Sequence, residues 1–391
     1  MLAILPRFPY PVDKGDKLRA FHHLRYLSRF HEISLFALND GPVPEEHLQV
    51  LRGFCKHITV YPLGKPGIFL RLLANIAGNI PFQTAWHFDA GAEKKLRDCI
   101  SAAAPDVLFY QLVRTAEFAK DTHLPKVLDL QDPMSENIRL RMAREPWWKR
   151  WIFRREYRRL LAYEARMPAR FDEICIISER DKADLPEPAR HTARLVSNGI
   201  DGAFYTPQPA GKTSDIVFVG SMSYLPNIEA AVFLVKEVLP ELQKRGVEVH
   251  ITIVGADPSA EVRALAGPSV TVTGRVPDTR TYYASARMML APMFINTGIQ
   301  NKILEAAAMG LPVVTTAQAN EAVGAEPGRQ LLLARTPVEF AEQAIRLLGD
   351  TAFAESVAGA GQEFVRSRFT WEACGRQLEE VLEAAVAKKK K

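Results

Sequence analysis

The second half of the chain alternates short apolar runs with longer stretches of helical spacing, and this alternation limits the fold more than any other feature. Strands are predicted at 216–220, 248–255, 270–274, 287–292 and 312–316, and helices at 227–246, 260–267, 279–286 and 299–310. Strict alternation of this kind is typical of a parallel sheet with helices on both faces.

The first half repeats the pattern less regularly. Strands are predicted at 2–6, 32–38, 57–63, 106–112, 125–130 and 172–178, and the clearest helix at 18–30. A chain of 391 residues is long for one hydrophobic core. We therefore predict an α/β protein of two Rossmann-like, doubly wound domains, 1–200 and 201–365, joined near the Gly- and Pro-rich stretch 198–215. A helix within 366–391 is expected to cross back to the first domain and to end in a basic tail.

The overall composition excludes several classes of protein. The net charge of +5 is too small to indicate nucleic-acid binding. The four cysteines form no C-x-x-C pair, the nine histidines form no metal-binding pattern, and the chain contains no D-x-D sequence, so we expect no metal and no other cofactor. No apolar run reaches the ~18 residues of a spanning helix. The N-terminus has no signal-peptide pattern, and we expect a cytoplasmic protein.

Glycines follow three predicted strands of the second half, at Gly220, Gly255 and Gly274. In open parallel sheets, ligands bind beyond the carboxyl ends of the strands, and glycine allows a ligand or another backbone to come close. The alternative is that each glycine only permits a tight turn. Three glycines at the same edge favour a ligand.

The stretch "NTGIQNKILEAAAMGLPVVTT" (296–316) reads as a turn, a helix and a buried strand. The helix N-terminus provides free N–H groups for an anion, and Lys302 adds a charge. Glu305 lies three residues further, on the same side of the helix, where a carboxylate can accept two hydrogen bonds from a ribose. This layout suits a nucleotide diphosphate sugar, and the alternative is an exposed Lys–Glu pair. No G-x-G-x-x-G follows a strand, so an NAD enzyme is not expected.

Two loops of the first half carry charged residues at predicted strand ends. The segment Asp13–Lys17 surrounds Gly15 before the first helix, and either faces a ligand or forms a solvated turn. Asp129 and Asp132 end another strand, where a carboxylate can orient or deprotonate an acceptor hydroxyl. Alternatively, Asp132 caps the next helix.

With these residues in place, the chain resembles glycosyltransferase family 4, which has the GT-B fold. The motifs that carry the resemblance are "PRFPYPVDKGDKLRAFHHLRYLS", "FVGSMSYLPN", "VTVTGRVPD", "GIQNKILEAAAMGLPVVTT" and "EFAEQAIRLLGD". The pattern "GIQNK-LEA-AMG-PVV" also resembles the sugar transferases of exosortase (PEP-CTERM) exopolysaccharide loci. The resemblance implies two domains facing across a cleft and metal-independent, retaining transfer from a nucleotide sugar. We expect a UDP-linked donor and transfer of a hexose.

The resemblance also assigns roles to residues. The residues implied to bind the nucleotide sugar are Gly15, Gly220, Ser221, Arg275, Val276, Thr297, Gly298, Ile299, Gln300, Asn301, Lys302 and Glu305. In this assignment Glu305 holds the ribose, residues 298–302 hold the sugar and phosphates, and Arg275 with Val276 flanks the base.

Three positions depart from the family pattern. Thr297 replaces the first of two glutamates that normally stand eight positions apart. The usual Arg and Lys after the first strand of the second domain are missing, so Lys302 and Arg275 must supply positive charge. No histidine occupies the usual acceptor-side position, which leaves Asp129 and Asp132, with Lys302, as the catalytic candidates.

The stretch 144–167 combines eight Arg or Lys with three Trp, one Phe and two Tyr. A basic helix with aromatic residues is typical of an anionic membrane surface, and 65–82 is a second candidate. The alternative is an amphipathic helix packed on the first domain. A lipid-linked or polysaccharide acceptor accounts for a membrane surface. Two other functions remain open: a nucleotide-sugar epimerase of the same architecture and a non-catalytic nucleotide-sugar binding protein.

Overall fold

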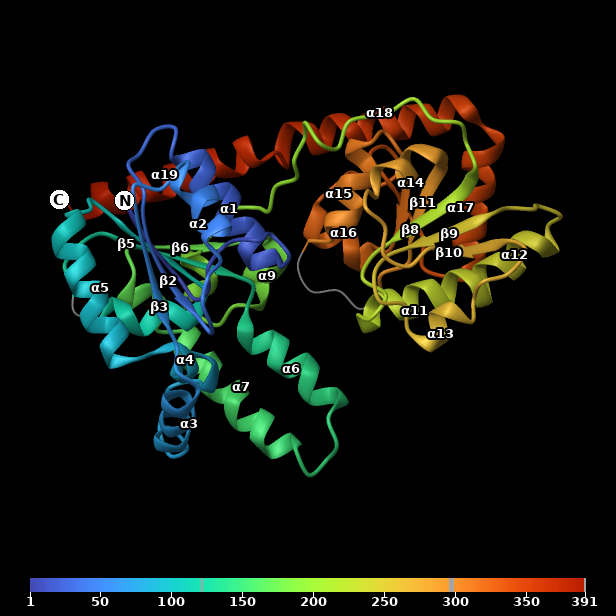
Figure 1. The fold of residues 1–391 in the computed structure, drawn as a ribbon. Coiled ribbons are helices and arrows are strands. Elements are labelled where there is room, and N and C mark those ends of the chain that lie inside the picture. The colour runs from blue at the N-terminus through green and yellow to red at the C-terminus, as the bar shows by residue number, and fades with distance from the viewer. Residues whose placement is uncertain (121, 295–298, 390–391) are drawn as a thin grey trace. The chain divides into compact units, whose positions relative to one another are not determined.

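The computed structural model describes residues 1–120, 122–294 and 299–389, which form two compact units (Figure 1). The first unit is Met1–Asn198 with Trp371–Lys391, and the second is Gly199–Thr370. The last two lysines of the predicted basic tail lie outside the described residues. Each unit is built on one parallel sheet with helices on both faces, so the predicted pair of Rossmann-like domains is confirmed.

The sheet of the first unit has the strand order β3-β2-β1-β4-β5-β6-β7, and all its pairs are parallel. Its strands are β1 (Leu2–Leu5), β2 (Ser34–Asn39), β3 (His57–Pro62), β4 (Leu108–Gln111), β5 (Lys126–Gln131), β6 (Glu173–Ile176) and β7 (Arg194–Leu195). The middle strands β1, β2, β4, β5 and β6 are buried along nearly their whole length, because both faces of the sheet are covered.

The helices of the first unit lie on both faces of this sheet. They are α1 (Gly15–Leu27), α2 (Glu45–Arg52), α3 (Lys65–Ala74), α4 (Phe82–His87), α5 (Ala90–Ala103), the 3₁₀ helix η1 (Val113–Ala119), α6 (Met134–Arg144), α7 (Arg150–Glu164), α8 (Met167–Arg170), α9 (Glu179–Asp184), α10 (Ala189–Thr192) and α19 (Trp371–Lys389).

Side chains of β1 alternate between two hydrophobic cores. Leu2 and Ile4 pack with Leu96 of α5 and Leu160 of α7. Ala3 and Leu5 face the opposite way, toward α1 and the C-terminal helix α19. The last helix of the chain thus completes the core of the first unit.

The sheet of the second unit has the order β10-β9-β8-β11-β12-β13, again with parallel pairs. Its strands are β8 (Ser214–Val219), β9 (Ile251–Val254), β10 (Val270–Val272), β11 (Ala286–Ala291), β12 (Val313–Thr315) and β13 (Leu332–Leu333). Its helices are α11 (Leu225–Phe233), the π-helical turn η2 (Leu234–Val238), α12 (Leu239–Lys244), α13 (Ala260–Arg263), α14 (Arg280–Ser285), α15 (Asn301–Ala308), α16 (Ala317–Val323), α17 (Pro337–Gly349) and α18 (Thr351–Arg368).

The basic and aromatic stretch 144–167 is not one helix. It contains the end of α6, a turn, the whole of α7 and the start of α8, so that α6 and α7 form a helical hairpin (Figure 1). Glu164 fastens the base of the hairpin, since its carboxylate accepts hydrogen bonds from the Ser135 amide at 3.1 Å and the Ser135 hydroxyl at 2.5 Å. Of the helices that the structure describes, none is long and apolar enough to cross a membrane.

Candidate functional site

The glycines at the carboxyl end of the second sheet are required by close packing of its loops. A Cβ atom on Gly255, where φ is 155°, would lie 1.6 Å from the carbonyl oxygen of Gly220. A Cβ atom on Gly220 would lie 2.7 Å from the side-chain nitrogen of Asn227. The approach of the Gly220 backbone therefore accounts for Gly255, as one of the explanations offered for these glycines expected, whereas the side chain of Asn227 accounts for Gly220. The second contact places Asn227 of α11 against the loop after β8.

Lys302 is buried at the start of α15. Its ammonium group donates to Asn227 Oδ1 at 2.5 Å and to Gln300 Oε1 at 3.3 Å, and it lies over the ring of Phe218. Burial lowers the pKa of Lys302 to about 8. The described residues give it no carboxylate within ion-pair distance, and its side chain is only 9% exposed. The alternative of a solvated Lys–Glu pair is therefore wrong for this lysine.

Asn227 connects this lysine to the loop after β8. Its Oδ1 accepts from Lys302, and its Nδ2 donates to the carbonyl of Ser221 at 2.9 Å. The sequence analysis missed Asn227 because it stands in the first turn of a predicted helix. A polar amide among the apolar residues of that helix was the available signal.

Glu305 lies one turn after Lys302 on α15 and is half-buried. Its carboxylate accepts a hydrogen bond from the Tyr283 hydroxyl at 2.9 Å and another from Tyr205. Burial raises the pKa of Glu305. A carboxylate offers about four acceptor positions, so two remain for a ligand diol. Neither tyrosine was predicted, because both are distant in sequence from α15.

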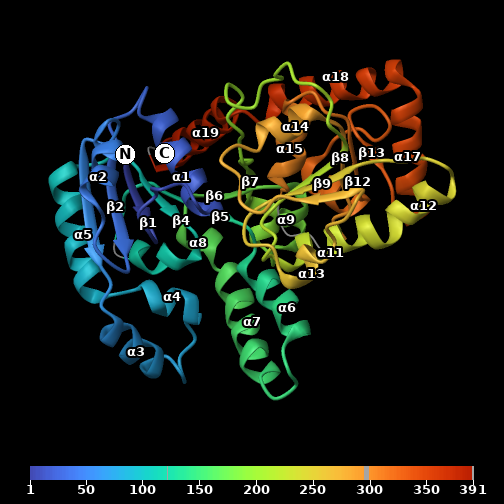
Figure 2. The same ribbon diagram turned by 45° about the vertical axis from the view of Figure 1, so that its right-hand side comes forward.

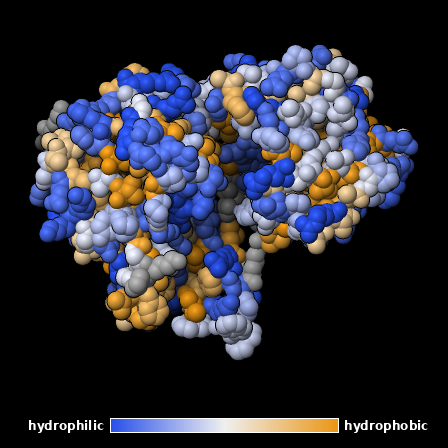
Figure 3. All heavy atoms as spheres, in the orientation of Figure 1, coloured by the Kyte–Doolittle hydropathy of each residue, from blue (hydrophilic) through white to orange (hydrophobic). Residues whose placement is uncertain are grey.

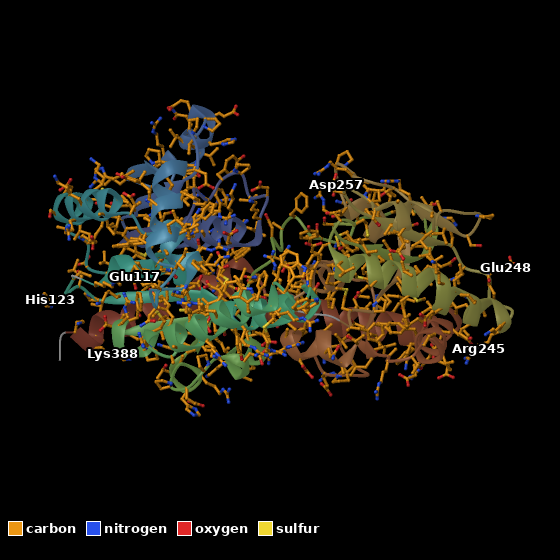
Figure 4. The ribbon with its side chains drawn as sticks, turned by 90° about the horizontal axis from the view of Figure 1, so that it is seen from below. Glu117, His123, Arg245, Glu248, Asp257 and Lys388 are labelled. Atoms are coloured by element: carbon orange, nitrogen blue, oxygen red, sulfur yellow. The ribbon has the colours of Figure 1, made fainter. Side chains whose placement is uncertain are left out.

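The other predicted residues of the second unit differ in their exposure. Ser221 is exposed, and its hydroxyl oxygen lies 3.1 Å from that of Ser223. Arg275 is exposed and pairs with Asp257, from the loop after β9, at 3.2 Å (Figure 4). Val276 is half-buried, next to Arg275.

The predicted turn before α15 is described only in part. Ile299 is buried, Gln300 accepts from Lys302, and Asn301 begins α15. Thr297 and Gly298 lie outside the described residues.

Asp129 does not have the surroundings of a catalytic base, and this expectation needs correction. It is fully buried, and its two carboxylate oxygens accept from the Arg19 guanidinium at 2.7 and 3.0 Å. Arg19 also donates to the backbone carbonyls of Val196 and Ser197. The pair joins α1 to β5, and because Asp129 is 0% exposed, an acceptor cannot reach its carboxylate.

Asp132 lies just beyond β5 and is half-buried. It accepts from the side chain of Asn137 at 2.6 Å, and burial raises its pKa. Its side chain does not cap α6, whose N-cap position is Pro133. The capping alternative is thus wrong, and Asp132 stays a candidate proton acceptor.

Gly15 is exposed at the first position of α1, and a Cβ atom there would meet nothing within 4 Å. Two of the neighbouring charges are already paired, Lys17 with Asp13 at 2.9 Å and Asp16 with Arg7 at 3.1 Å. Neither packing nor backbone conformation explains why residue 15 is a glycine. The role of Gly15 in facing the donor stays a prediction.

The basic stretch of α7 forms a second candidate surface. Trp147, Trp148 and Trp151 are 82%, 55% and 66% exposed. Beside them lies a groove of about 720 Å³ whose lining includes six arginines: Arg150, Arg154, Arg155, Arg158, Arg159 and Arg166. The inner end of α7 is fixed, because Tyr163 donates to the buried carboxylate of Glu117 at 2.6 Å (Figure 4). The hairpin therefore presents cations and aromatic rings together.

The part of the chain that the structure describes contains no group of three or more His, Cys, Asp or Glu side chains that could hold a metal ion.

Comparison with known proteins agrees with this architecture. Residues 213–350 match the family described as glycosyl transferases group 1. A Klebsiella pneumoniae relative, described as an uncharacterized 44.6 kDa protein in the cps region, is 20% identical, and the match covers 92% of this chain and 94% of the relative.

Two solved structures of low sequence identity share the fold over nearly the whole chain. Sucrose-phosphate synthase from Thermosynechococcus elongatus is 15% identical with a TM-score of 0.70, and the match covers 99% of each chain. Anabaena HepE in complex with UDP is 15% identical with a TM-score of 0.67, covering 98% of this chain and 99% of HepE. The chain therefore has the GT-B fold, and its residues 213–350 are similar to the glycosyl transferases group 1 family.

Proposed function

We propose that the protein is a metal-independent, retaining glycosyltransferase that moves a hexose from a nucleotide diphosphate sugar, UDP-linked, to a lipid-linked or polysaccharide acceptor. One observation carries the proposal. A buried lysine, which has no carboxylate within ion-pair distance among the described residues, and a carboxylate held by two tyrosines stand one turn apart on α15. Solved structures of the same fold with UDP bound support the choice of nucleotide.

In this proposal Lys302 and the N–H groups at the start of α15 bind the diphosphate. Glu305 accepts hydrogen bonds from the ribose with the positions that the tyrosines leave free. As the sugar leaves, negative charge grows on the diphosphate, and a buried ammonium stabilises that charge more strongly than an exposed one. Arg275 and Val276 flank the base.

The first unit supplies the residues proposed to act on the acceptor. Asp132, whose pKa burial raises, takes the proton of the acceptor hydroxyl in place of Asp129. A raised pKa makes a carboxylate a better proton acceptor near neutral pH. The roles toward the donor that the family resemblance gives to Gly15, Thr297 and Gly298 belong to the same proposal.

The assignment to family 4 and to the exosortase-associated subgroup belongs to the same proposal. The cps region of the Klebsiella relative supports a role in polysaccharide assembly. We place the enzyme in the cytoplasm, on the inner membrane face, where the α7 tryptophans and arginines bind anionic lipid.

The transfer proposal is tested by mixing the protein with UDP-sugars and lipid-linked acceptors in a chelating buffer and measuring UDP release and the anomer formed. We expect release without metal, a retained configuration, and a loss of at least about tenfold in Lys302→Met. Lys236→Met is the matched control, because it replaces an exposed lysine of the same unit. Interconversion of donor sugars without an acceptor would indicate an epimerase, and donor binding without turnover a binding protein.

The membrane proposal is tested by sedimentation with phosphatidylglycerol vesicles and with neutral phosphatidylcholine vesicles. We expect binding to the anionic vesicles alone, weakened by Trp147→Ser with Trp151→Ser. Phe30→Ser controls for general surface hydrophobicity, because it replaces another exposed aromatic residue of the first unit. Equal binding to both kinds of vesicle, or equal loss in the control, contradicts the proposal.

A further inference from the structure

The first unit contains a groove of about 670 Å³ that the donor site does not use. Its apolar walls come from α7 and from α3 and α4, of which the last two lie side by side in both ribbon views (Figures 1 and 2). They include Phe69, Leu73, Ile76, Trp86, Ile152 and Phe153. Hydrophobic surface gathers over α3 at this end of the unit (Figure 3).

The apolar walls are unusually open to solvent. Phe69 and Leu73 on α3 are 63% and 47% exposed, Ile76 just after α3 is 55% exposed, and Ile152 on α7 is 40% exposed. Covering such surface yields about 25 cal/mol per Å², and a contiguous exposed apolar patch marks a binding surface. A sugar has too few apolar groups to cover these walls, whereas a hydrocarbon chain suits them.

The other end of the groove is cationic. Arg7 follows β1 and Arg114 follows β4, and these two strands are neighbours in the sheet. Arg7 has a carboxylate partner in Asp16. Arg114 donates to the side-chain oxygen of Gln83 at 3.1 Å and has no carboxylate within ion-pair distance in the described part of the chain. An anion placed here would balance the Arg114 charge.

Two carboxylates and a histidine also line the groove, and neither carboxylate pairs with Arg114 in the described part of the chain. Glu156 is 5% exposed and already accepts the backbone N–H of Phe82 at 2.7 Å. Asp40 stands at the rim, with no ion pair among the described residues. His87 donates from Nδ1 to the Gln83 carbonyl, and burial lowers its pKa to about 4, so it is neutral.

We propose that this groove binds the acceptor as an amphipathic molecule, with a phosphate against Arg114 and a hydrocarbon chain between α3 and α7. The inference rests on the proposed function, because it names the acceptor class as a lipid phosphate rather than a free polysaccharide. Arg114 also acts electrostatically on Asp132. A sugar joined to that phosphate would then bring its hydroxyl toward Asp132, the residue proposed to take the proton of the acceptor hydroxyl.

The test uses farnesyl phosphate below its micelle concentration, with farnesol and inorganic phosphate as its two separate parts, in calorimetry without vesicles. We expect farnesyl phosphate to bind at least about tenfold more tightly than either part, since both ends of the groove then contribute. Arg114→Gln should reduce its affinity to that of farnesol. Leu73→Glu, at an exposed position, should weaken both farnesyl compounds and spare the fold.

Arg154→Gln is the matched control, because Arg154 lines the separate arginine groove of α7. If Arg154→Gln loses affinity and Arg114→Gln does not, the phosphate binds the α7 surface and the inference is overturned. It is also overturned if farnesyl phosphate binds no better than its parts. UDP binding is measured on the same samples to separate the two claims. If the protein binds UDP but not farnesyl phosphate, this inference alone is wrong. If it binds farnesyl phosphate but not UDP, the donor assignment is wrong.

Discussion

The ammonium of Lys302 lies 2.5 Å from Oδ1 of Asn227, whose amide nitrogen donates to the Ser221 carbonyl. One side chain thus joins α15, α11 and the loop after β8 at the carboxyl end of the sheet. A flexible lysine loses rotamer freedom when it binds a phosphate. Here the lysine is held before any ligand arrives, so less of that entropy is lost on binding.

Removing Asn227 should weaken nucleotide binding without unfolding the domain. In Asn227→Ala the lysine keeps only Gln300 as an oxygen partner, and the loop after β8 loses its link to α15. We expect the Kd for UDP to rise about tenfold, or ~1.4 kcal/mol. Gln362→Ala removes a similar amide bond to the other end of α15 and should leave the Kd unchanged. Equal losses in both variants, measured by calorimetry, would contradict the account.

Nucleotide affinity should fall as the pH rises through 8. Burial lowers the pKa of Lys302 to about 8, and only the protonated form attracts a diphosphate. Between pH 7 and pH 9 the Kd for UDP should therefore rise about tenfold. Lys302→Arg should remove this dependence, since a guanidinium stays charged. Uridine, which lacks phosphates, controls for other titrations, and the same pH profile for uridine and UDP would rule out Lys302 as the phosphate ligand.

Asp129→Asn should destabilise the first unit rather than impair catalysis alone. The substitution leaves the buried Arg19 without its counter-charge, and breaking a buried ion pair costs about 3–5 kcal/mol. Urea unfolding measures this change. Asp13→Asn, in a half-exposed pair with Lys17, should cost less than ~1 kcal/mol. A variant at Asp129 with wild-type stability and no turnover would restore it as a catalytic residue.

The stability of the protein should fall between pH 4.5 and pH 7 because of Glu164. Burial raises the pKa of this carboxyl to about 7, so the folded state holds a proton that the unfolded state releases near 4.5. The contribution of protonated Glu164 to the free energy of unfolding is fully present below about pH 4.5. This contribution, roughly 3 kcal/mol, is lost as the pH rises to 7. Glu164→Gln should flatten this part of the curve in urea unfolding. An unchanged slope would mean that Glu164 is ionised in the hairpin.

The parallel sheets were predictable because short apolar runs alternate with stretches of helical spacing along the chain. The two short strands β7 and β13 were missed, since two residues carry no periodicity. The long helix predicted at 227–246 begins at Leu225 and contains a π-helical turn, which the apolar spacing does not reveal.

The candidate site was predictable only where it is local in sequence. Lys302 and Glu305 stand one turn apart, so helical geometry alone joins them. Asn227, Tyr205 and Tyr283 reach them from elsewhere in the fold. The error at Asp129 has the same origin: its position at a strand end was evident, but its partner Arg19 is 110 residues away.

The ribose assignment of Glu305 is the central claim, and calorimetry of UDP and its 2′,3′-dideoxy analogue in metal-free buffer tests it most directly. If Glu305 holds the ribose, wild type should prefer UDP by at least about tenfold, and Glu305→Ala should bind both nucleotides equally. Tyr283→Phe, which leaves the carboxylate in place, should keep most of the preference. Equal binding of both nucleotides by the wild type, or an undiminished preference in Glu305→Ala, would contradict the account.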